Sequence, residues 1–351
     1  MNKKKLYTAV LWLGILSIIG IGMNSSFAAE VYRPQVVAHR GASGYLPEHT
    51  LEAKAMGYGL GSDYLEQDVV MTKDGQLVVL HDLLLDTTTN VAEVFPDRAR
   101  DDGRYYVTDF TLDELRTLRL TERFDHETKK PVFSGRFPDS PISYRIHTLE
   151  EEFYQLVGLN KSTGRNVKAS VEVKEQQWFM DQGYDPLKAT IEVMDKFGFN
   201  DPKSGVILQT FDYDSVVRAR TELGWKGELL MSVSPNGQAH KKGDKERMAW
   251  LQTPEGIKEV SKYATIYSPW LSLMAVPNAN GKGYKMSNIA DLARKNGMEV
   301  HTWTLRRDSL DKGFNNFNEV LDVCFKELKV DAVVTDFPDV VIDYLEKNGM
   351  R

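Results

Sequence analysis

The stretch Glu66-Gln-Asp68-Val-Val-Met-Thr-Lys-Asp74-Gly75-Gln-Leu-Val-Val-Leu-His81-Asp82 predicts two apolar strands joined by a tight turn. Asp74-Gly75 is a strong hairpin signal, because a two-residue turn needs positive φ. Such a turn would place Asp68 opposite His81, and directly opposed side chains lie about 5 Å apart. Glu66 shares a face with Asp68, because strand side chains repeat every two residues. The stretch therefore predicts two carboxylates and an imidazole in one cluster.

This cluster has the composition of a site for a hard divalent cation. Two neighbouring carboxylates repel, and one pKa is strongly raised unless a cation lies between them. Ca²⁺ and Mg²⁺ bind oxygen ligands, and Glu172 in the run Val-Glu172-Val-Lys174 is the candidate for a third ligand. Arg40 and Lys174 bring positive charge to the same place, as the developing charge of a reacting phosphate ester requires. With His39 and His81 as a general acid and base, the pattern predicts metal-assisted phosphodiester cleavage.

Each of these residues also has a purely structural interpretation. Glu66 and Asp68 could be ordinary acids at a strand end, although two acids within an apolar run are costly unless they bind something. His39 follows the apolar run Val-Val-Ala and could be a hydrogen-bonded core histidine. Its neighbour Arg40 argues against this, since two cationic groups at one strand end call for an anion. Glu172 and Lys174 could form a plain ion pair along a strand.

Apolar, β-branched runs alternate with helix-like stretches along most of the chain. Strands are expected near 36–39, 64–71, 168–173, 206–210, 227–233, 264–268, 298–304 and 331–335, and helices over 185–198, 212–223, 256–263, 287–297 and 316–328. This alternation predicts an α/β protein with a parallel sheet, and eight such strands predict a closed (β/α)8 TIM barrel. Barrel active sites lie at the carboxyl ends of the strands, where His39, Glu66, Glu172 and the turn Asp336-Phe337-Pro338 fall. The return from Lys73 to His81 would lie beside the barrel.

Residues 83–148 differ in texture from the rest of the chain. The segment is charged and rich in turns, with arginines at 98, 100, 104, 116, 119 and 123. We interpret it as an insertion after the second strand region that caps the barrel mouth. The alternative is a solvated charged face, since runs of charge usually mark exposed surface.

The N-terminus has the pattern of a signal peptide. Lys3-Lys4-Lys5 precede an apolar run from Leu6 to Met23 and a small-residue cleavage pattern, which predicts a signal peptide over 1–28 and a mature domain over 29–351. The apolar run is long enough to keep an uncleaved anchor as an alternative. We therefore expect a secreted or periplasmic protein without stable membrane association after cleavage. Removing the three lysines would take the net charge from −6 to −9, which disfavours nucleic acid as a partner.

Five motifs in this order resemble one known family. They are His39-Arg40-Gly41, Pro47-Glu48-His49-Thr50, Glu66-x-Asp68, His81-Asp82 and Glu172-x-Lys174. Together they resemble the signature of the glycerophosphodiester phosphodiesterases, over the length from about Val36 to Pro338. The secreted or periplasmic branch carries His at position 49, as this chain does, whereas many relatives carry Asn there. In this respect the chain is similar to that branch. From its place at a helix start, we interpret His49 as a helix-capping or supporting residue rather than a directly catalytic one.

The resemblance implies an activity and a division of roles. Glu66, Asp68 and Glu172 would hold one divalent cation, with Ca²⁺ favoured over Mg²⁺ by kinship with the secreted branch. Arg40 and Lys174 would bind the phosphate, and His39 and His81 would act as acid and base. Apart from the resemblance, Phe211 and Trp303 either simply pack the barrel mouth or form apolar walls for the glycerol moiety. The products would be sn-glycerol 3-phosphate and an alcohol such as choline, ethanolamine or glycerol. Which histidine is the acid, whether water or the glycerol 2-hydroxyl attacks, and the oligomeric state stay open.

Two other functions fit parts of the pattern. A barrel phospholipase would share the chemistry but needs an apolar rim that contacts a membrane, whereas the segment 83–148 is polar. A secreted binding protein that kept the barrel and lost the chemistry would have no need of all five of His39, His81, Glu66, Asp68 and Glu172. Both alternatives are therefore weaker than cleavage of a small glycerophosphodiester.

Overall fold

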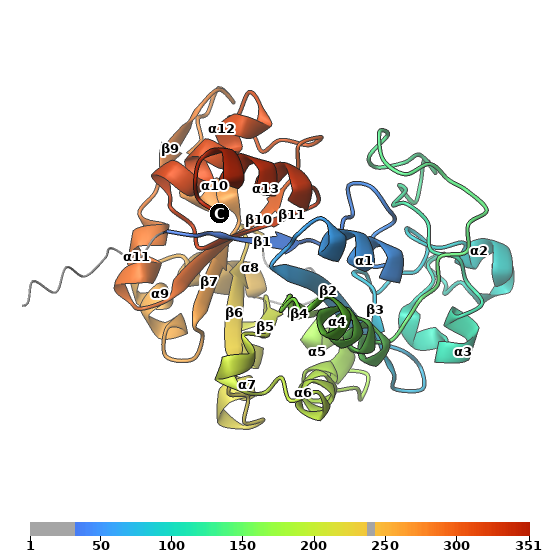
Figure 1. The fold of residues 1–351 in the computed structure, drawn as a ribbon. Coiled ribbons are helices and arrows are strands. Elements are labelled where there is room, and N and C mark those ends of the chain that lie inside the picture. The colour runs from blue at the N-terminus through green and yellow to red at the C-terminus, as the bar shows by residue number, and fades with distance from the viewer. Residues whose placement is uncertain (1–31, 237–242) are drawn as a thin grey trace, which may run out of the picture. The chain divides into compact units, whose positions relative to one another are not determined.

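Eight parallel strands close into a barrel within the residues that the computed structural model describes, 32–236 and 243–351 (Figure 1). The barrel strands are β1 (Gln35–Ala38), β2 (Tyr64–Met71), β4 (Lys168–Val173), β5 (Ile207–Thr210), β6 (Glu228–Val233), β7 (Ile266–Pro269), β10 (Glu299–Leu305) and β11 (Ala332–Thr335). They lie in the order β1-β11-β10-β7-β6-β5-β4-β2, and pairing of β1 with β2 closes the ring. The predicted TIM barrel is confirmed, and two of the predicted strands, 64–71 and 168–173, match to the residue.

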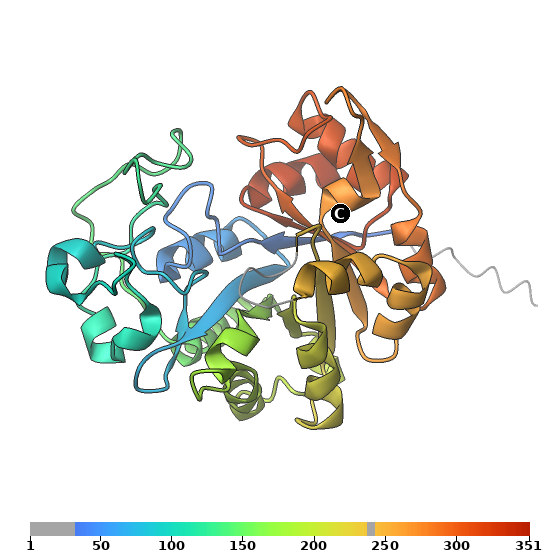
Figure 2. The ribbon, with the colours of Figure 1, turned by 180° about the vertical axis from the view of Figure 1, so that it is seen from behind.

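Helices follow most of the strands and cover the outside of the barrel (Figures 1 and 2). The covering helices are α1 (Leu51–Gly59), α4 (Leu149–Thr163), α6 (Pro186–Lys196), α7 (Tyr213–Thr221), α9 (Pro254–Val260), α11 (Ile289–Lys295), α12 (Phe317–Asp322) and α13 (Pro338–Lys347). Shorter elements are α5 (Gln176–Met180), η3 (Pro202–Ser204), α8 (Asp244–Leu251), α10 (Leu271–Met274), η4 (Val323–Glu327) and the small sheet of β8 (Ala275–Pro277) and β9 (Tyr284–Met286). Local sequence fixes several helix starts: Thr148 and Glu151 form a capping box for α4, and Thr50 caps α1.

The strands are buried on both faces, as expected for a parallel barrel with helices outside. Alternate strand residues pack outward against the helices, as Val36 and Ala38 do in β1. The residues between them point into the barrel and fill its lower part with a separate apolar cluster of Val37, Tyr64, Ile207, Leu230, Ile266, Ala332 and Val334. No helix among the described residues combines the length and the apolarity needed to cross a membrane.

The hairpin after β2 differs from its predicted register by one residue. β3 (Leu77–Val79) pairs antiparallel with β2, with Val69 opposite Val79 and Met71 opposite Leu77. The loop therefore has three residues between Thr72 and Gln76. Gly75 supplies the positive φ, +74°, of the last loop residue, which is the geometry of a type I turn followed by a left-handed residue. The predicted opposition of Asp68 and His81 is wrong: the Leu80 N–H donates to Asp68 O, and His81 lies one residue beyond.

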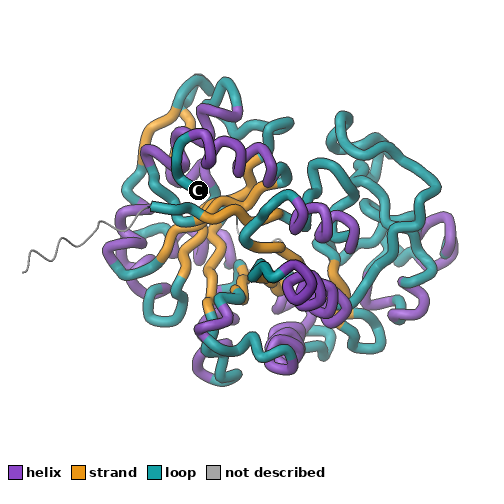
Figure 3. The backbone as a smooth tube through the Cα atoms, viewed as in Figure 1, coloured by secondary structure: helices purple, strands orange, loops and turns teal. Residues whose placement is uncertain are grey.

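The segment 83–148 is mostly loop and lies beside the barrel, next to β3 and α1 (Figure 3). Its short helices are α2 (Val91–Val94), η1 (Pro96–Arg98), η2 (Val107–Asp109) and α3 (Leu112–Leu115). Several of its arginines pair with acids of the same segment, as Arg104 does with Asp86 and Arg100 with Asp109. At the barrel mouth, the segment reaches one edge through Arg123 and Arg136. That it caps the mouth stays a prediction, as does the signal peptide over 1–28, which lies outside the described residues.

Candidate active site

The strand periodicity that fills the barrel with apolar side chains places polar ones at its upper end. On β2, Glu66 and Asp68 follow Tyr64 at steps of two residues, so all three side chains lie on the same face of the strand. The same step leads from Ile207 to Gln209, from Leu230 to Ser232 and from Ile266 to Ser268, and all of these polar residues line one cavity of about 650 Å³. The interior thus changes from apolar to polar at the carboxyl ends of the strands, where barrel active sites lie.

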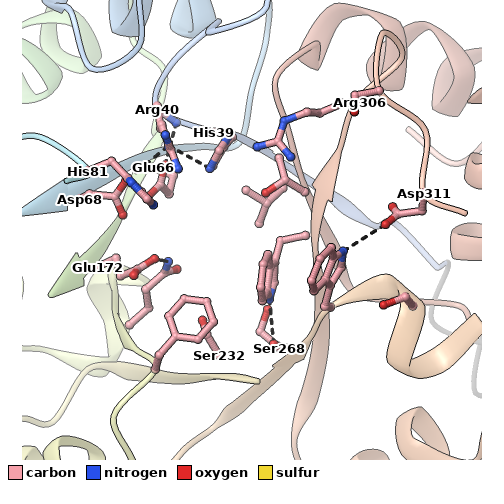
Figure 4. Close-up of a pocket in the computed structure, with 18 of the residues that line it drawn as sticks. His39, Arg40, Glu66, Asp68, His81, Glu172, Ser232, Ser268, Arg306 and Asp311 are labelled. Atoms are coloured by element: carbon pink, nitrogen blue, oxygen red, sulfur yellow. Dashed lines mark hydrogen bonds and ion pairs between the residues drawn. The ribbon is translucent and has the colours of Figure 1, made fainter. Parts of the chain in front are cut away.

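Three buried carboxylates, of Glu66, Asp68 and Glu172, meet at one side of this cavity (Figure 4). Asp68 lies in register with Glu172 on the neighbouring strand, and each of the three acids offers an oxygen within 4.8 Å of the others. The Arg40 backbone N–H donates to Glu66 Oε2 at 2.6 Å, and Gln209 Nε2 donates to Glu172 Oε2 at 2.9 Å. Asp68 Oδ1 is buried and accepts no hydrogen bond.

Ionisation of all three acids is unfavourable in the absence of a cation, because they are buried and repel one another. Burial, together with the charge of Asp68, raises the pKa of Glu66 well above its usual range. Burial and Asp68 likewise raise the pKa of Glu172 to about 7, against the opposing effect of Lys174. For Asp68, the cost of burial is outweighed by Lys174 and His81, which hold its pKa well below normal. A divalent cation between the acids would remove the repulsion.

His39 lies at the end of β1, with its ring held from both sides. Its Nδ1 is 2.6 Å from Asp336 Oδ1, at the end of β11, and Arg40 Nε donates to its Nε2 at 3.2 Å. Burial and the charge of Arg40 lower the pKa of His39 to about 3, so the ring is neutral near pH 7. Asp336 has a pKa well below its usual range and, as a carboxylate, accepts a hydrogen bond from Nδ1–H. Nε2 is therefore the ring atom that can exchange a proton.

His81 reaches the same cavity from beyond β3, and Asp82 binds its Nδ1. Burial and the charges of Arg40 and Lys174 lower the pKa of His81 to about 4, so this ring is also neutral near pH 7. The sequence prediction thus placed His81 in the right site through the wrong strand register. The two imidazoles have the same arrangement: each has an aspartate on Nδ1, and each lines the cavity.

The two predicted phosphate-binding residues lie among the acids. Lys174 Nζ is 2.5 Å from Glu172 Oε1 and 3.9 Å from Asp68 Oδ1. Arg40 pairs with Glu48 at 2.8 Å and lies 3.5 Å from Asp68. Both side chains line the cavity. The cavity therefore has basic and acidic side chains next to each other, which suits a substrate with an anionic phosphate and a bound cation.

An aromatic group forms another part of the cavity wall. Phe211 and Trp303, both predicted as apolar walls, meet edge to face with their ring centroids 5.1 Å apart. Trp270 stacks on Trp303 at 5.7 Å, and Trp303 Nε1 donates to Ser268 O, which fixes the orientation of the indole. Lys174 Nζ lies 5.6 Å from the Phe211 ring, so this wall begins next to the charged groups.

His49 supports the site from behind. Its Nε2 is 2.8 Å from Asp68 Oδ2, and its side chain is buried. Thr50, not His49, caps helix α1. Of the two supporting roles predicted for His49, the contact with a candidate metal ligand is therefore the one that the structure contains.

Sequence reasoning missed some residues that line the site or hold it. Asp336 was noted only as part of a turn at a strand end, and the cavity-lining residues Gln209, Trp270 and Arg306 were not singled out. All four lie at or just after the carboxyl end of a predicted strand. A systematic search of those positions would have found them. Arg123 and Arg136 lie in the irregular segment 83–148, where no periodicity indicates their placement.

The sequence profile of the glycerophosphoryl diester phosphodiesterase family matches residues 39–340. The chain belongs to this family. Among its relatives, a glycerophosphodiester phosphodiesterase of Haemophilus influenzae is 38% identical and covers 99% of each chain. Another, from Treponema pallidum, is 33% identical over 97% of this chain and 98% of the relative. The chain is thus an enzyme that hydrolyses phosphodiesters.

Solved structures of the same fold include one with a bound product. A phosphodiesterase from Oleispira antarctica, in complex with the product sn-glycerol 3-phosphate, aligns with a TM-score of 0.58 at 20% identity, over 90% of this chain and 98% of that one. A glycerophosphodiester phosphodiesterase from Agrobacterium tumefaciens aligns with a TM-score of 0.57 at 19% identity, over 88% of this chain and 99% of that one. At these identities the similarity shows the fold.

Proposed function

We propose that the enzyme hydrolyses small glycerophosphodiesters to sn-glycerol 3-phosphate and an alcohol such as choline, ethanolamine or glycerol. The observation that carries this proposal is the meeting of three carboxylates, two aspartate-bound histidines and two basic side chains in one cavity of about 650 Å³. A cavity of this size suits a small molecule. The product bound by the Oleispira antarctica relative supports the same substrate class.

The acids fit one divalent cation. Their donor atoms are all oxygens, as Ca²⁺ and Mg²⁺ require, and the buried Asp68 Oδ1 has no hydrogen-bond partner. Glu66, Asp68 and Glu172 would hold the ion, and we propose Ca²⁺ in preference to Mg²⁺. When bound, the cation supplies positive charge to the phosphodiester oxygens and relieves the repulsion between the three acids.

The roles of the other residues follow from their charges and from the ring atoms that face the cavity. Arg40 and Lys174 neutralise the remaining phosphate charge. One of His39 and His81, neutral with its proton on Nδ1, takes up a proton at Nε2 from the attacking hydroxyl or water. The other gives a proton to the leaving alcohol from Nε2, and it takes up that proton when the anionic substrate binds and favours the imidazolium form. Each ring is held by an aspartate at Nδ1, so that Nε2 does this exchange. Phe211 and Trp303 form the apolar wall against which the carbon skeleton of the substrate packs.

Secretion is part of the proposal and rests on the sequence of residues 1–28. Removal of that segment would release the domain into the periplasm or the medium. N-terminal sequencing of the mature protein from those fractions tests this, and a mature chain that still contains the apolar run would contradict it.

The first experiment measures release of sn-glycerol 3-phosphate from glycerophosphocholine by purified residues 29–351. It is run with EDTA, with added Ca²⁺, with added Mg²⁺ and with the His39→Ala variant. We expect release that needs the cation, is supported better by Ca²⁺ and is abolished in His39→Ala. A folded protein that releases nothing with either cation would refute the assignment of a small diester substrate.

A further inference from the structure

Both candidate catalytic histidines are connected to the segment 83–148 by the same three-residue chain. In each chain an imidazole Nδ1 binds an aspartate, and the other oxygen of that aspartate binds an arginine of the segment. One chain is His39–Asp336–Arg136, and the other is His81–Asp82–Arg123. The aspartates come from distant parts of the chain, after β11 and after β3.

In the first chain, Arg136 is almost completely buried. Its side chain is 5% exposed, and its Nη2 donates to Asp336 Oδ2 at 2.7 Å. Arg306 donates to the same oxygen at 2.7 Å, so Asp336 is held by two guanidinium groups while its Oδ1 faces His39. The ring of Phe133 lies 3.6 Å from the Arg136 guanidinium and fixes its plane.

In the second chain, Arg123 ties His81 to the other side of the site. Its Nη1 donates to Asp82 Oδ2 at 2.5 Å. Its Nε and Nη2 donate to Glu48 at 3.1 and 2.7 Å, and Glu48 in turn accepts from Arg40 at 2.8 Å. Arg123 therefore fixes the partner of one histidine and, through Glu48, a candidate phosphate-binding residue.

The contacts of these two arginines argue against a role in binding an anion. All three nitrogens of each guanidinium already donate to protein oxygens: those of Arg123 to Glu48 and Asp82, those of Arg136 to Asp308, Asp336 and Ser43 O. A hollow of about 270 Å³ lies beside them, but the donors are bound to carboxylates and to the Ser43 carbonyl. The geometry of the donors therefore matches a fixed support.

Other arginines of the segment show what a purely structural pair looks like. Arg98 pairs with Glu114, Arg100 with Asp109 and Arg119 with Asp139, all within the segment. Arg116 reaches Glu151 of α4, but that pair is about 43% exposed. Exposed pairs of this kind contribute little. Arg123 and Arg136 differ because they leave the segment and end, buried, on the partners of the two histidines.

We propose that the segment 83–148 positions both catalytic histidines, Arg136 acting through Asp336 and Arg123 acting through Asp82. This rests on the proposed function, in which His39 and His81 exchange protons at Nε2. Each arginine holds its aspartate in the orientation that accepts the Nδ1 proton, and the aspartate holds the ring plane. Without the arginine, the aspartate is held by fewer donors, Arg306 for Asp336 and Thr87 for Asp82, and the ring keeps its orientation less firmly.

The test compares kcat and KM for glycerophosphocholine, at saturating Ca²⁺, in Arg123→Met, Arg136→Met and the control Arg119→Met. Arg119 belongs to the same segment, and its side chain is 22% exposed against 18% for Arg123. Its guanidinium donates through Nη1 to Asp139 and to the Ser140 carbonyl. Circular dichroism and thermal melting establish that each variant is folded. Arg123→Lys and Arg136→Lys, which keep the charge, serve as second variants where the methionine variants do not fold.

We expect kcat to fall about tenfold or more in each methionine variant, the usual size for a residue that orients a site ligand. KM should stay within about twofold of wild type in Arg136→Met and should rise in Arg123→Met, because Arg123 also holds Arg40 through Glu48. The lysine variants should recover part of kcat, and Arg119→Met should retain wild-type values. A folded variant with wild-type kcat overturns the proposal. So does a raised KM with unchanged kcat, because that result identifies the arginine as a substrate-binding residue.

Failure of this inference can be told apart from failure of the proposed function. Nitrogen chemical shifts of the labelled imidazoles report which ring nitrogen carries the proton, in the absence of substrate. We expect His39 and His81 to carry it on Nδ1 in wild type and to show a mixture of the two forms in the corresponding arginine variant. If wild type releases no product, the function fails while this measurement still decides the positioning. Unchanged imidazole spectra in both variants contradict the inference whatever the activity.

Discussion

Asp68 on β2 lies directly in register with Glu172 on β4, with both side chains on the inner face of the barrel. Taken separately, Asp68 of β2 and Glu172 of β4 each have the sequence pattern of an ordinary acid near a strand end. The parallel pairing brings the two together, and the two-residue period adds Glu66 on the same face. Three buried carboxylates in one cluster are a destabilising arrangement unless a cation joins them, which leads to the first two predictions.

Replacing Glu172 with Gln should separate stability from function. Removal of one of three repelling carboxylates should raise the melting temperature of the cation-free protein, while the affinity for Ca²⁺ falls about tenfold or more and activity falls with it. Calorimetric titration with Ca²⁺ and thermal melting in EDTA measure the two effects. Glu192→Gln, which alters an exposed acid of α6, is the control. A cation-free variant less stable than wild type would contradict the prediction and show that the lost ion pair with Lys174 outweighs the repulsion between the acids.

The same residue should make the stability of the cation-free protein depend on pH. The folded pKa of Glu172, about 7, lies above its ordinary value of 4.5. The folded state therefore binds this proton more tightly than the unfolded state, so the contribution is favourable below about pH 4.5 and is lost as the pH rises through 7.

In EDTA, the melting temperature of Glu172→Gln should exceed that of wild type by a margin that grows from pH 5 to pH 8. Comparing the two proteins at each pH cancels the titration of the buried histidines, which acts in the opposite direction. Ca²⁺ should close the gap at pH 8 by stabilising wild type alone. A margin that does not change with pH would contradict the raised pKa.

The parts of this site that the sequence predicted are those that depend on local periodicity. His39, Glu66, Asp68 and Glu172 fall within or at the end of apolar runs whose strand character is plain, and the barrel rule places strand ends together. His81 was placed by an assumed two-residue turn. Asp74-Gly75 is compatible with that turn and with a three-residue loop, and the structure contains the latter. Turn residues alone therefore left the register uncertain by one residue.

The supporting residues could not be predicted, because their positions depend on contacts between distant parts of the chain. Asp336 lies 297 residues from His39, and they meet only because β1 pairs with β11. Arg123 and Arg136 lie in a segment without strand or helix periodicity, so nothing local indicates that they reach the histidine partners. Tertiary packing alone brings them there.

The aromatic wall should affect substrate binding more than chemistry. Phe211→Ala removes a ring that lines the cavity and meets Trp303 edge to face. We expect KM for glycerophosphocholine to rise about fivefold, since loss of part of an apolar contact costs about 1 kcal/mol, while kcat changes little. Phe314→Ala, which removes a ring stacked on Tyr284 and not part of the cavity lining, controls for lost packing. A fall in kcat with constant KM would assign Phe211 to the chemical step instead.

Glu122, in the segment 83–148, should be a source of instability at alkaline pH. Its Oε2 is buried without a hydrogen-bond partner, and burial together with the charge of Glu48 raises its pKa to about 7. Since the folded pKa exceeds the ordinary 4.5, the folded protein is destabilised as the pH rises from 4.5 through 7 and Glu122 ionises. Glu122→Gln should therefore raise the melting temperature at pH 8 and leave it nearly unchanged at pH 5.

The control is Glu127→Gln, which alters an exposed acid of the same segment and should have no effect on the melting temperature at either pH. Because Glu122 precedes Arg123, an equal shift at both pH values would instead indicate that the substitution moves the arginine and its contact with Asp82.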